Sequence, residues 1–141
     1  RGLVIARRPW RLAASGGLPW AGLQLRLMTL GYAPANYELA MYYRLVAHNY
    51  PKAAGYYLLA ASQGNNDAAF FMSGVFDKTS PDVDRMWYAP DERLHKLYDG
   101  IYDQLSADPD LRFPNLIKDH PLPPHPTQGY DADRPDWKSG Q

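Results

Sequence analysis

Acidic residues and a histidine recur at intervals of four between residues 91 and 103, which places them on one face of a helix. The series consists of Asp91, His95, Asp99 and Asp103. Carboxylate oxygens and an imidazole nitrogen arranged in this way could bind a metal ion. The spacing is also typical of a solvated polar stripe opposite an apolar face, and that face is present in Leu94, Leu97, Ile101 and Leu105. We interpret the series as a polar stripe and predict no metal site.

Two further histidines, His120 and His125, lie in a proline-rich stretch, where a carboxylate could pair with either ring. A flexible tail is a poor platform for catalysis, because catalytic groups must be held in a fixed geometry. The sequence has no cysteine, no phosphate-binding glycine loop and no nucleophile elbow. We therefore predict that the chain is not an enzyme and has neither catalytic residues nor a cofactor.

The elements that position these side chains are helices, and the clearest are two short helices within residues 52–76. Small and aromatic residues recur there at helical spacing on both sides of Gly64. Glycine suits the end of a helix because it adopts positive φ without strain. Asn65, Asn66 and Asp67 follow and offer a turn and an N-cap. The pattern predicts an αα-hairpin.

The hairpin pattern recurs upstream when Gly64 is aligned with Gly31. The matched pairs are Ala68 with Ala35, Met72 with Leu39, Ser73 with Ala40, and Phe76 with Tyr43. A repeat of this length is typical of a helical solenoid, in which each hairpin covers the apolar face of its neighbour.

Further helices are predicted over residues 18–30, from Pro34 to about Ala47, and over residues 90–106. A turn is predicted at residues 49–51, between the helix that begins at Pro34 and the hairpin. The helix over residues 90–106 does not continue the repeat, so we predict a terminal cap helix. From Asp108 onward the chain is rich in proline and is expected to be extended, apart from a helical turn over residues 115–118. Its expected anchors on the helices are Leu111, Phe113, Leu116, Ile117 and Leu122.

The repeated residues resemble the Sel-one-like repeat, a relative of the tetratricopeptide repeat. The resemblance is carried by Lys52, Ala53, Tyr57, Ala60, Ala61, Gly64, Ala68, Met72, Ser73 and Phe76. Ser73 stands where the family usually has glycine, and the linker between units is a few residues short. The resemblance implies an all-α fold, a short right-handed α-solenoid of antiparallel helix hairpins. We expect residues 1–107 to form this array with its cap helix, and residues 108–141 to form an extended proline-rich C-terminal tail packed on it.

The C-terminal segment is similar to the tail of a bacterial domain that follows Sel-one-like repeats. The residues that carry this resemblance are Phe113, Pro114, Leu116, Asp119, Pro121, Leu122, Pro123, Pro124, Pro126 and Trp137. Proteins with this tail look like immunity proteins encoded beside phospholipase effectors of type VI secretion systems. The resemblance implies a non-catalytic protein-binding module that neutralises a cognate phospholipase-type toxin, either as a monomer or in a one-to-one heterodimer. The alternative is an adaptor or scaffold for a bacterial signalling or envelope complex.

The charges are unevenly distributed, although the net charge is zero. Residues 1–66 contain seven basic residues, counting lysine and arginine together, and one acidic residue. Residues 67–141 contain eight basic residues and fourteen acidic residues. No nucleic-acid recognition motif accompanies the few basic residues, so we expect no nucleic-acid partner. No apolar run is long enough to span a membrane. Immunity to an effector that acts on envelope lipids implies the periplasm, with a signal removed before Arg1, and the cytoplasm is the alternative.

Tyrosines beside the repeat positions, rather than on them, are expected to point away from the core. Exposed tyrosine and arginine side chains are frequent in binding hot spots. The partner-binding residues that we predict are Arg26, Tyr42, Arg44, Tyr50, Tyr56, Trp87 and Tyr88.

Overall fold

The computed structural model describes residues 33–131, 133 and 134. The predicted helix over residues 18–30, which includes Arg26, therefore lies outside the described residues, as do Gly31 and Trp137. The described part contains five helices and no β-strand, which confirms the all-α prediction for that part. The helices are α3 (Ala33–Leu45), α4 (Tyr50–Ser62), α5 (Asn66–Val75), α6 (Glu92–Ala107) and α7 (Leu116–Asp119). None of these five is long and apolar enough to cross a membrane.

The central hairpin forms where the sequence predicts it, with α4 and α5 joined through Gly64. Gly64 has a φ of +95°, a conformation that side chains with a Cβ rarely adopt. The side chain of Asn65 then accepts a hydrogen bond from the Ala68 N–H at 2.9 Å and caps α5. Asn49 caps α4 in the same way, by accepting from the Lys52 N–H at 3.1 Å. Local capping chemistry therefore fixes both helix starts.

The boundary between α3 and α4 differs from the prediction. Helix α3 ends at Leu45 rather than near Ala47, and Tyr50 and Pro51 form the first turn of α4 rather than the connecting turn. His48 has a φ of +53°, which reverses the chain just before the Asn49 cap. Proline is tolerated at this point because the first N–H groups of a helix have no helical partner.

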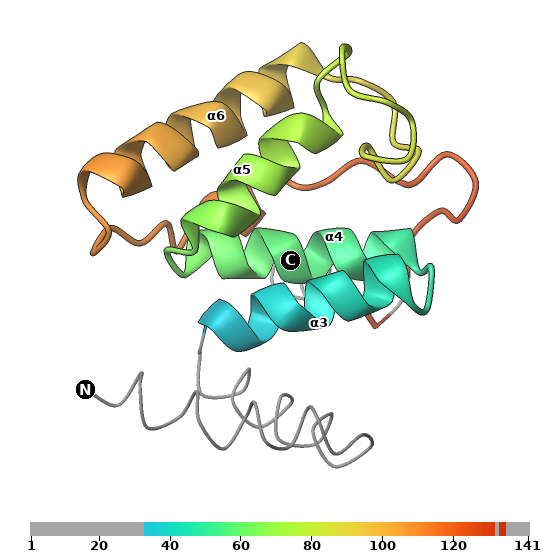
Figure 1. Cartoon of the computed structure of the whole chain (residues 1–141), viewed down its shortest axis with the longest axis horizontal. Coiled ribbons are helices and arrows are strands. Elements are labelled where there is room, and N and C mark those ends of the chain that lie inside the picture. The colour runs from blue at the N-terminus through green and yellow to red at the C-terminus, as the bar shows by residue number, and fades with distance from the viewer. Residues whose placement is uncertain (1–32, 132, 135–141) are drawn as a thin grey trace.

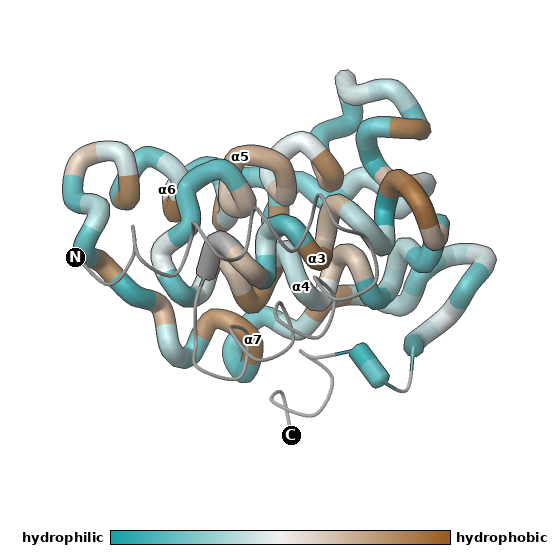
Figure 2. The backbone as a smooth tube through the Cα atoms, turned by 60° about the horizontal axis from the view of Figure 1, so that its bottom comes forward, coloured by the Kyte–Doolittle hydropathy of each residue, from teal (hydrophilic) through white to brown (hydrophobic). Residues whose placement is uncertain are grey.

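Each long helix packs mainly against the helix before and after it in the chain: α3 on α4, α4 on α5, and α5 on α6 (Figure 1). Alanines at the contacts between these helices are fully buried and let the backbones approach closely. They are Ala53, Ala54, Ala60, Ala61, Ala68 and Ala69. Larger buried side chains, including Tyr57, Met72 and Phe76, fill the space beside them. Figure 2 shows the apolar stretches in α4 and α5, with more polar turns and connections around them.

Helix α6 begins at Glu92, two residues after the predicted start, because the side chain of Asp91 accepts from the Leu94 N–H at 3.2 Å and acts as the N-cap. Its packed face contains Leu94, Tyr98, Ile101 and Leu105, all buried. Its remaining side chains are mostly polar and mostly exposed, although His95 and Tyr102 still contact α5.

The segment after α6 runs back along the molecule and ends near the start of α4 (Figure 1). The Phe113 N–H donates to the Ser62 carbonyl at 2.8 Å, and α7 packs on α4. At the far end, Asn49 Nδ2 donates to Asp131 Oδ2 at 2.5 Å. The five side chains expected to anchor this segment are buried or pack against the core. The segment therefore bridges both ends of α4.

Candidate protein-binding groove

A groove of about 580 Å³ lies between the end of α3, the exposed face of α5, the loop over residues 77–84, and α6. We call it the Arg44 groove. Its lining residues are Arg44, Phe70, Phe71, Ser73, Gly74, Asp77, Ser80, Asp84 and His95. Pockets of roughly 300–1,000 Å³ are typical of ligand sites. The groove is therefore large enough to accept a side chain from another molecule.

Helix α5 supplies the floor of the groove because only one of its faces is used by the core. Ala68, Ala69 and Met72 point into the core and are fully buried. Phe70 lies on the other face, with 62% of its surface exposed, and contacts Tyr102 of α6 with ring centroids 5.2 Å apart. The exposed ring adds apolar area to the floor of the groove.

Gly74 leaves the floor open beside this ring. A Cβ atom at this position would have the Ser80 Oγ as its nearest neighbour, at 3.9 Å. The groove therefore reaches down to the backbone of α5, and any larger residue at position 74 would project into it.

Arg44 is held in place by two aromatic residues. Its Nε donates to the Tyr57 hydroxyl at 2.9 Å, and its Cζ lies 4.4 Å from the centroid of the Phe71 ring. Burial raises the pKa of Tyr57 to about 12, so the phenol stays neutral and accepts this bond at ordinary pH. Among the described residues, no carboxylate forms an ion pair with Arg44. The guanidinium is thus oriented but not neutralised.

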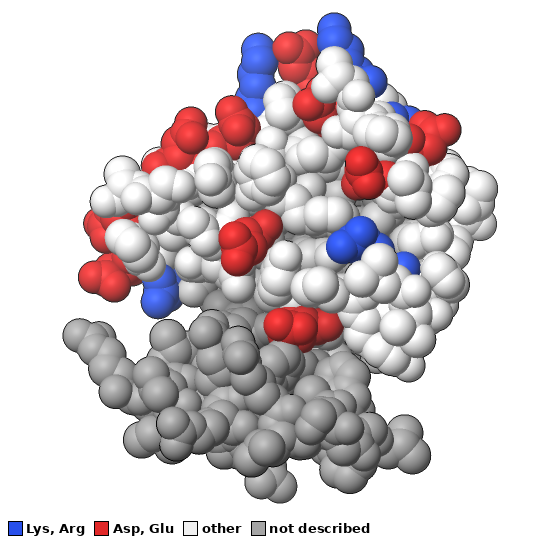
Figure 3. All heavy atoms as spheres, in the orientation of Figure 1, with Lys and Arg blue, Asp and Glu red and all other residues white. Residues whose placement is uncertain are grey.

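The loop after α5 adds carboxylates to the groove. Asp77 Oδ1 accepts from the Thr79 N–H at 3.0 Å and from the Thr79 hydroxyl at 2.9 Å, and these bonds lower the pKa of Asp77. Asp84 is exposed and forms no ion pair within the described part of the chain. Figure 3 shows acidic side chains along α6 and around this loop on the face in view.

Arg85 fixes the shape of the loop that carries these carboxylates. Its guanidinium donates to the Ser80 carbonyl and pairs with Asp82, and its Nε donates to the Tyr88 carbonyl at 3.2 Å. The carboxylates are therefore presented from a structured loop.

Ser73 and His95 are adjacent in the groove but do not form a nucleophile and base pair. His95 Nδ1 lies 2.8 Å from the Ser73 carbonyl oxygen, which can only accept, so this nitrogen carries the proton. The same nitrogen is the one that faces the Ser73 hydroxyl, at 3.2 Å, and it cannot also remove its proton. Asp91 acts as the cap of α6, and the described residues contain no group of three potential metal ligands.

A second surface brings together aromatic residues at the start of α4. Tyr50 lies between Trp87, at a centroid distance of 5.3 Å, and His125, at 5.5 Å. His125 is buried, its Nε2 donates to the Met86 carbonyl at 2.7 Å, and its Nδ1 accepts from the Gln128 N–H at 3.1 Å. Trp87 remains 46% exposed. The histidine therefore joins the tail to the loop that presents this tryptophan.

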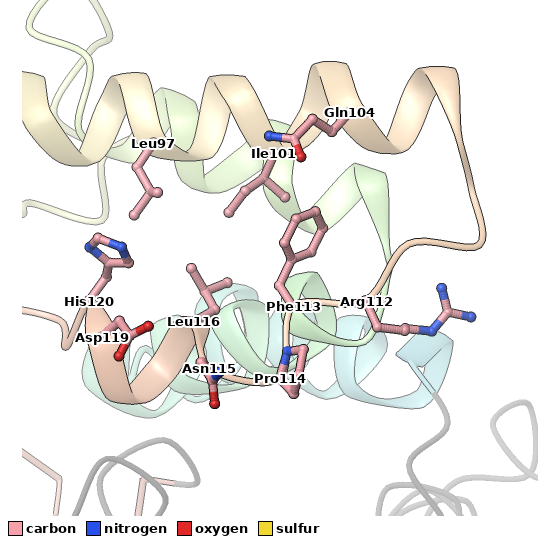
Figure 4. A pocket seen from close by; sticks show the side chains of 10 residues that line it. All are labelled: Leu97, Ile101, Gln104, Arg112, Phe113, Pro114, Asn115, Leu116, Asp119 and His120. Atoms are coloured by element: carbon pink, nitrogen blue, oxygen red, sulfur yellow. The ribbon is translucent and has the colours of Figure 1, made fainter.

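A separate hollow of about 370 Å³ lies between α6 and the segment around α7. In Figure 4, Leu97 and Ile101 point from α6 toward Phe113 and Leu116 on the opposite wall. Polar residues at its edge are engaged within the chain. Arg112 Nη1 donates to the Leu111 carbonyl at 2.7 Å, and His120 Nδ1 lies 3.3 Å from Arg93 Nη1. This hollow lies where the tail faces α6.

The predicted partner-binding residues are distributed unevenly over these surfaces. Arg44 lines the groove, Tyr50 and Trp87 form the second surface, and Tyr42 is 38% exposed on α3. The prediction that Tyr56 points away from the core is wrong, and Tyr88, also predicted to bind a partner, is buried.

Tyr56 is only 6% exposed because it stacks on Tyr43 with centroids 5.5 Å apart. Tyr88 is 1% exposed because it packs between Phe76, at 5.8 Å, and His125, at 4.8 Å. Both rings are part of the core, and a partner cannot contact them in this structure.

Three surface residues of the groove, Phe70, Gly74 and Asp84, were not predicted from the sequence. A signal for the first two was present, because Ala68, Ala69 and Met72 define the packed face of α5 and leave positions 70 and 74 on the other face. Asp84 had no such signal, since it lies in a loop whose path depends on tertiary contacts.

The described residues thus define an all-α protein with a preformed groove and an aromatic surface, both suited to holding another molecule. No protein-family model matches the chain, and none of the curated proteins matches it. Among solved structures, the chain is similar to immunity protein PA5088 from Pseudomonas aeruginosa, with 76% sequence identity, a TM-score of 0.84 and 94% of this chain covered.

The chain is also similar to immunity protein Pa5087 from Pseudomonas aeruginosa, with 51% identity, a TM-score of 0.85 and 96% of this chain covered. A third structure, described as Pseudomonas aeruginosa 5086 (PA5086), shares 50% identity, with a TM-score of 0.85 and 94% coverage of this chain. The chain spans about half of each, 52% of their length in every case.

Proposed function

We propose that this chain belongs to an immunity protein, which binds a toxin protein and neutralises it. The observation that carries this proposal is the 76% identity to immunity protein PA5088 over 94% of the chain. By analogy, an identity of 76% over nearly the whole chain makes a shared kind of partner the simplest expectation. The Arg44 groove and the Tyr50–Trp87 surface supply the material for such binding.

The toxin in this proposal is a cognate phospholipase effector of a type VI secretion system, and the complex is one to one. The tail motif from Phe113 to Trp137 supports this choice, because it resembles the tails of proteins encoded beside such effectors. An effector of this kind acts on envelope lipids, so the proposal places the encounter in the periplasm.

The same proposal treats the helices as Sel-one-like repeats stacked as a right-handed solenoid. The order of packing supports it, because each long helix contacts mainly its neighbours in the chain. In this arrangement residues 1–107 form the array with its cap helix, and residues 108–141 form a proline-rich tail that strengthens it. The tail contacts at Ser62 and Asn49 support that role.

Neutralisation requires only tight binding over the active site of the toxin and no chemistry by this chain. The groove is suited to it because Arg44 is held by Tyr57 and Phe71 before any partner arrives. A preorganised arginine loses little conformational entropy on binding, which favours high affinity.

The test is to express the full-length protein together with the effector encoded by the neighbouring gene. We expect a stable one-to-one complex by size-exclusion chromatography with light scattering, loss of lipid hydrolysis by the effector, and survival of cells that carry both genes. A complex that forms without inhibition would favour the adaptor alternative. No complex at all would contradict the proposal.

A further inference from the structure

We infer that the Arg44 groove receives a segment of the toxin in which an apolar side chain lies between an acidic residue and a basic residue. The inference rests on the proposed function, because it names the part of the toxin that this groove recognises. Three features of the described residues carry it: an open apolar floor, an arginine without an ionic partner, and carboxylates that line the same hollow.

The floor selects the apolar side chain. Phe70 exposes 62% of its surface, and Gly74 contributes no side chain, so an apolar group can lie directly on the backbone of α5. Phe71 continues the apolar surface under Arg44. Removing this area from water favours binding of an aliphatic or aromatic residue.

Arg44 selects the acidic residue. Its Nε is used by Tyr57, and the flat face of the guanidinium lies on Phe71. The terminal nitrogens can then form the paired hydrogen bonds that a carboxylate accepts. The aromatic surroundings exclude water from one side of the group, which strengthens such a pair.

The loop after α5 selects the basic residue. Asp77 and Asp84 line the same groove as Arg44, yet neither forms an ion pair with it. The bonds from Thr79 lower the pKa of Asp77 and keep that carboxylate ionised. A segment that carries an acidic and a basic residue can pair the first with Arg44 and the second with these carboxylates.

Purely anionic ligands fit the groove less well than a segment with both charges. A phosphate group or a nucleic acid would be attracted by Arg44 but repelled by Asp77 and Asp84. The exposed phenyl ring of Phe70 would also stay uncovered by a small anion. A protein segment satisfies all three features.

The first experiment blocks the floor. Gly74→Trp places a large side chain in the groove, while Gly100→Trp is the matched control, since a Cβ at Gly100 meets nothing within 4 Å and Gly100 does not line the groove. Both variants of the full-length protein are titrated with the cognate effector by calorimetry, and their melting temperatures confirm folding. We expect Gly74→Trp to raise the Kd by at least about tenfold and Gly100→Trp to leave it unchanged.

The second experiment reverses one charge. Asp84→Lys should raise the Kd by about tenfold, whereas Asp99→Lys makes the same change in net charge on α6 and should change it by less than about threefold. A basic residue of the effector, found by alanine scanning and changed to Glu, should restore binding to Asp84→Lys only. Equal effects of the two lysine variants, without such a rescue, would overturn the charge assignment.

A selection with phage-displayed random peptides separates this inference from the proposed function. Peptides selected on the full-length protein and lost on Gly74→Trp should share an acidic, an apolar and a basic residue in that arrangement. An inhibitory complex that tolerates Gly74→Trp would overturn the inference and leave the immunity function standing. If the effector does not bind at all, the proposed function is wrong. In that case the peptide selection still tests the inference, and absence of this motif among the selected peptides would overturn it as well.

Discussion

Replacement of Gly64 by alanine tests how the hairpin and the tail are joined. Gly64 has a φ of +95°, so any residue with a Cβ is strained there. Left-handed backbone costs about 1–2 kcal/mol for such a residue. The new Cβ would also overlap the Arg112 guanidinium and lie 3.0 Å from the Leu111 carbonyl oxygen. The guanidinium can move, but the carbonyl belongs to the backbone of the tail.

Together these effects predict that Gly64→Ala lowers the free energy of unfolding by about 2–3 kcal/mol. For a chain of this size the melting temperature should fall by about 6–12 °C. The matched control is Gly100→Ala, which lies in the interior of α6 with open space around it and should stabilise the chain by about 0.5–1 kcal/mol.

A double mutant separates strain from crowding. In an Arg112→Ala background the guanidinium is gone but the positive φ and the nearby Leu111 carbonyl remain, so Gly64→Ala should cost less than in the parent chain and still at least about 1–2 kcal/mol. Chemical denaturation of the four variants gives the values. If Gly64→Ala is as harmless as Gly100→Ala, the positive φ at position 64 does not require glycine.

Three further changes test the contacts that hold the tail and the groove. Asn49→Asp keeps the cap of α4 but places a second carboxylate beside Asp131, so it should speed proteolysis of the tail. Asn49→Ala removes the cap as well as the bond to Asp131, so it should lower the free energy of unfolding by about 1 kcal/mol in chemical denaturation. His125→Ala removes a buried ring and leaves the Met86 carbonyl without its donor, which should cost about 3 kcal/mol by the same method. The pKa of Tyr57 is raised from 10.0 to about 12 by burial, so its contribution to stability is complete below pH 10 and is lost as the pH rises through 12. Alkaline titration followed by phenolate absorbance and circular dichroism should show a late ionisation step that coincides with unfolding. Because burial raises the pKa of Tyr56 to about 12 as well, Tyr57→Phe should lower the absorbance amplitude of that step by one phenol rather than remove it.

The parts of the fold that follow local rules could be predicted from the sequence. Gly64, the Asn65 cap and the apolar face of α6 each depend on residues within a few positions of one another. The buried tail residues Leu116 and Leu122 also stood out, as apolar side chains in a stretch too rich in proline for a long helix.

The candidate site could be predicted only in part, because it depends on which residues tertiary packing covers. Arg44 was predicted, but its groove combines side chains from three helices and a loop that the sequence does not place together. The loop turns at Met86 and Trp87 with φ of +50° and +60°, which non-glycine residues rarely adopt. Contacts with Arg85 and His125 hold this turn, and the same packing buries Tyr88.

We propose that this protein neutralises a toxin by holding it in the Arg44 groove. Hydrogen–deuterium exchange of the full-length protein, alone and saturated with the cognate effector, tests it most directly. Binding in the groove should slow exchange in α5 and in the loop over residues 77–84. Slowed exchange confined to the tail over residues 121–131, with α5 unchanged, would contradict it.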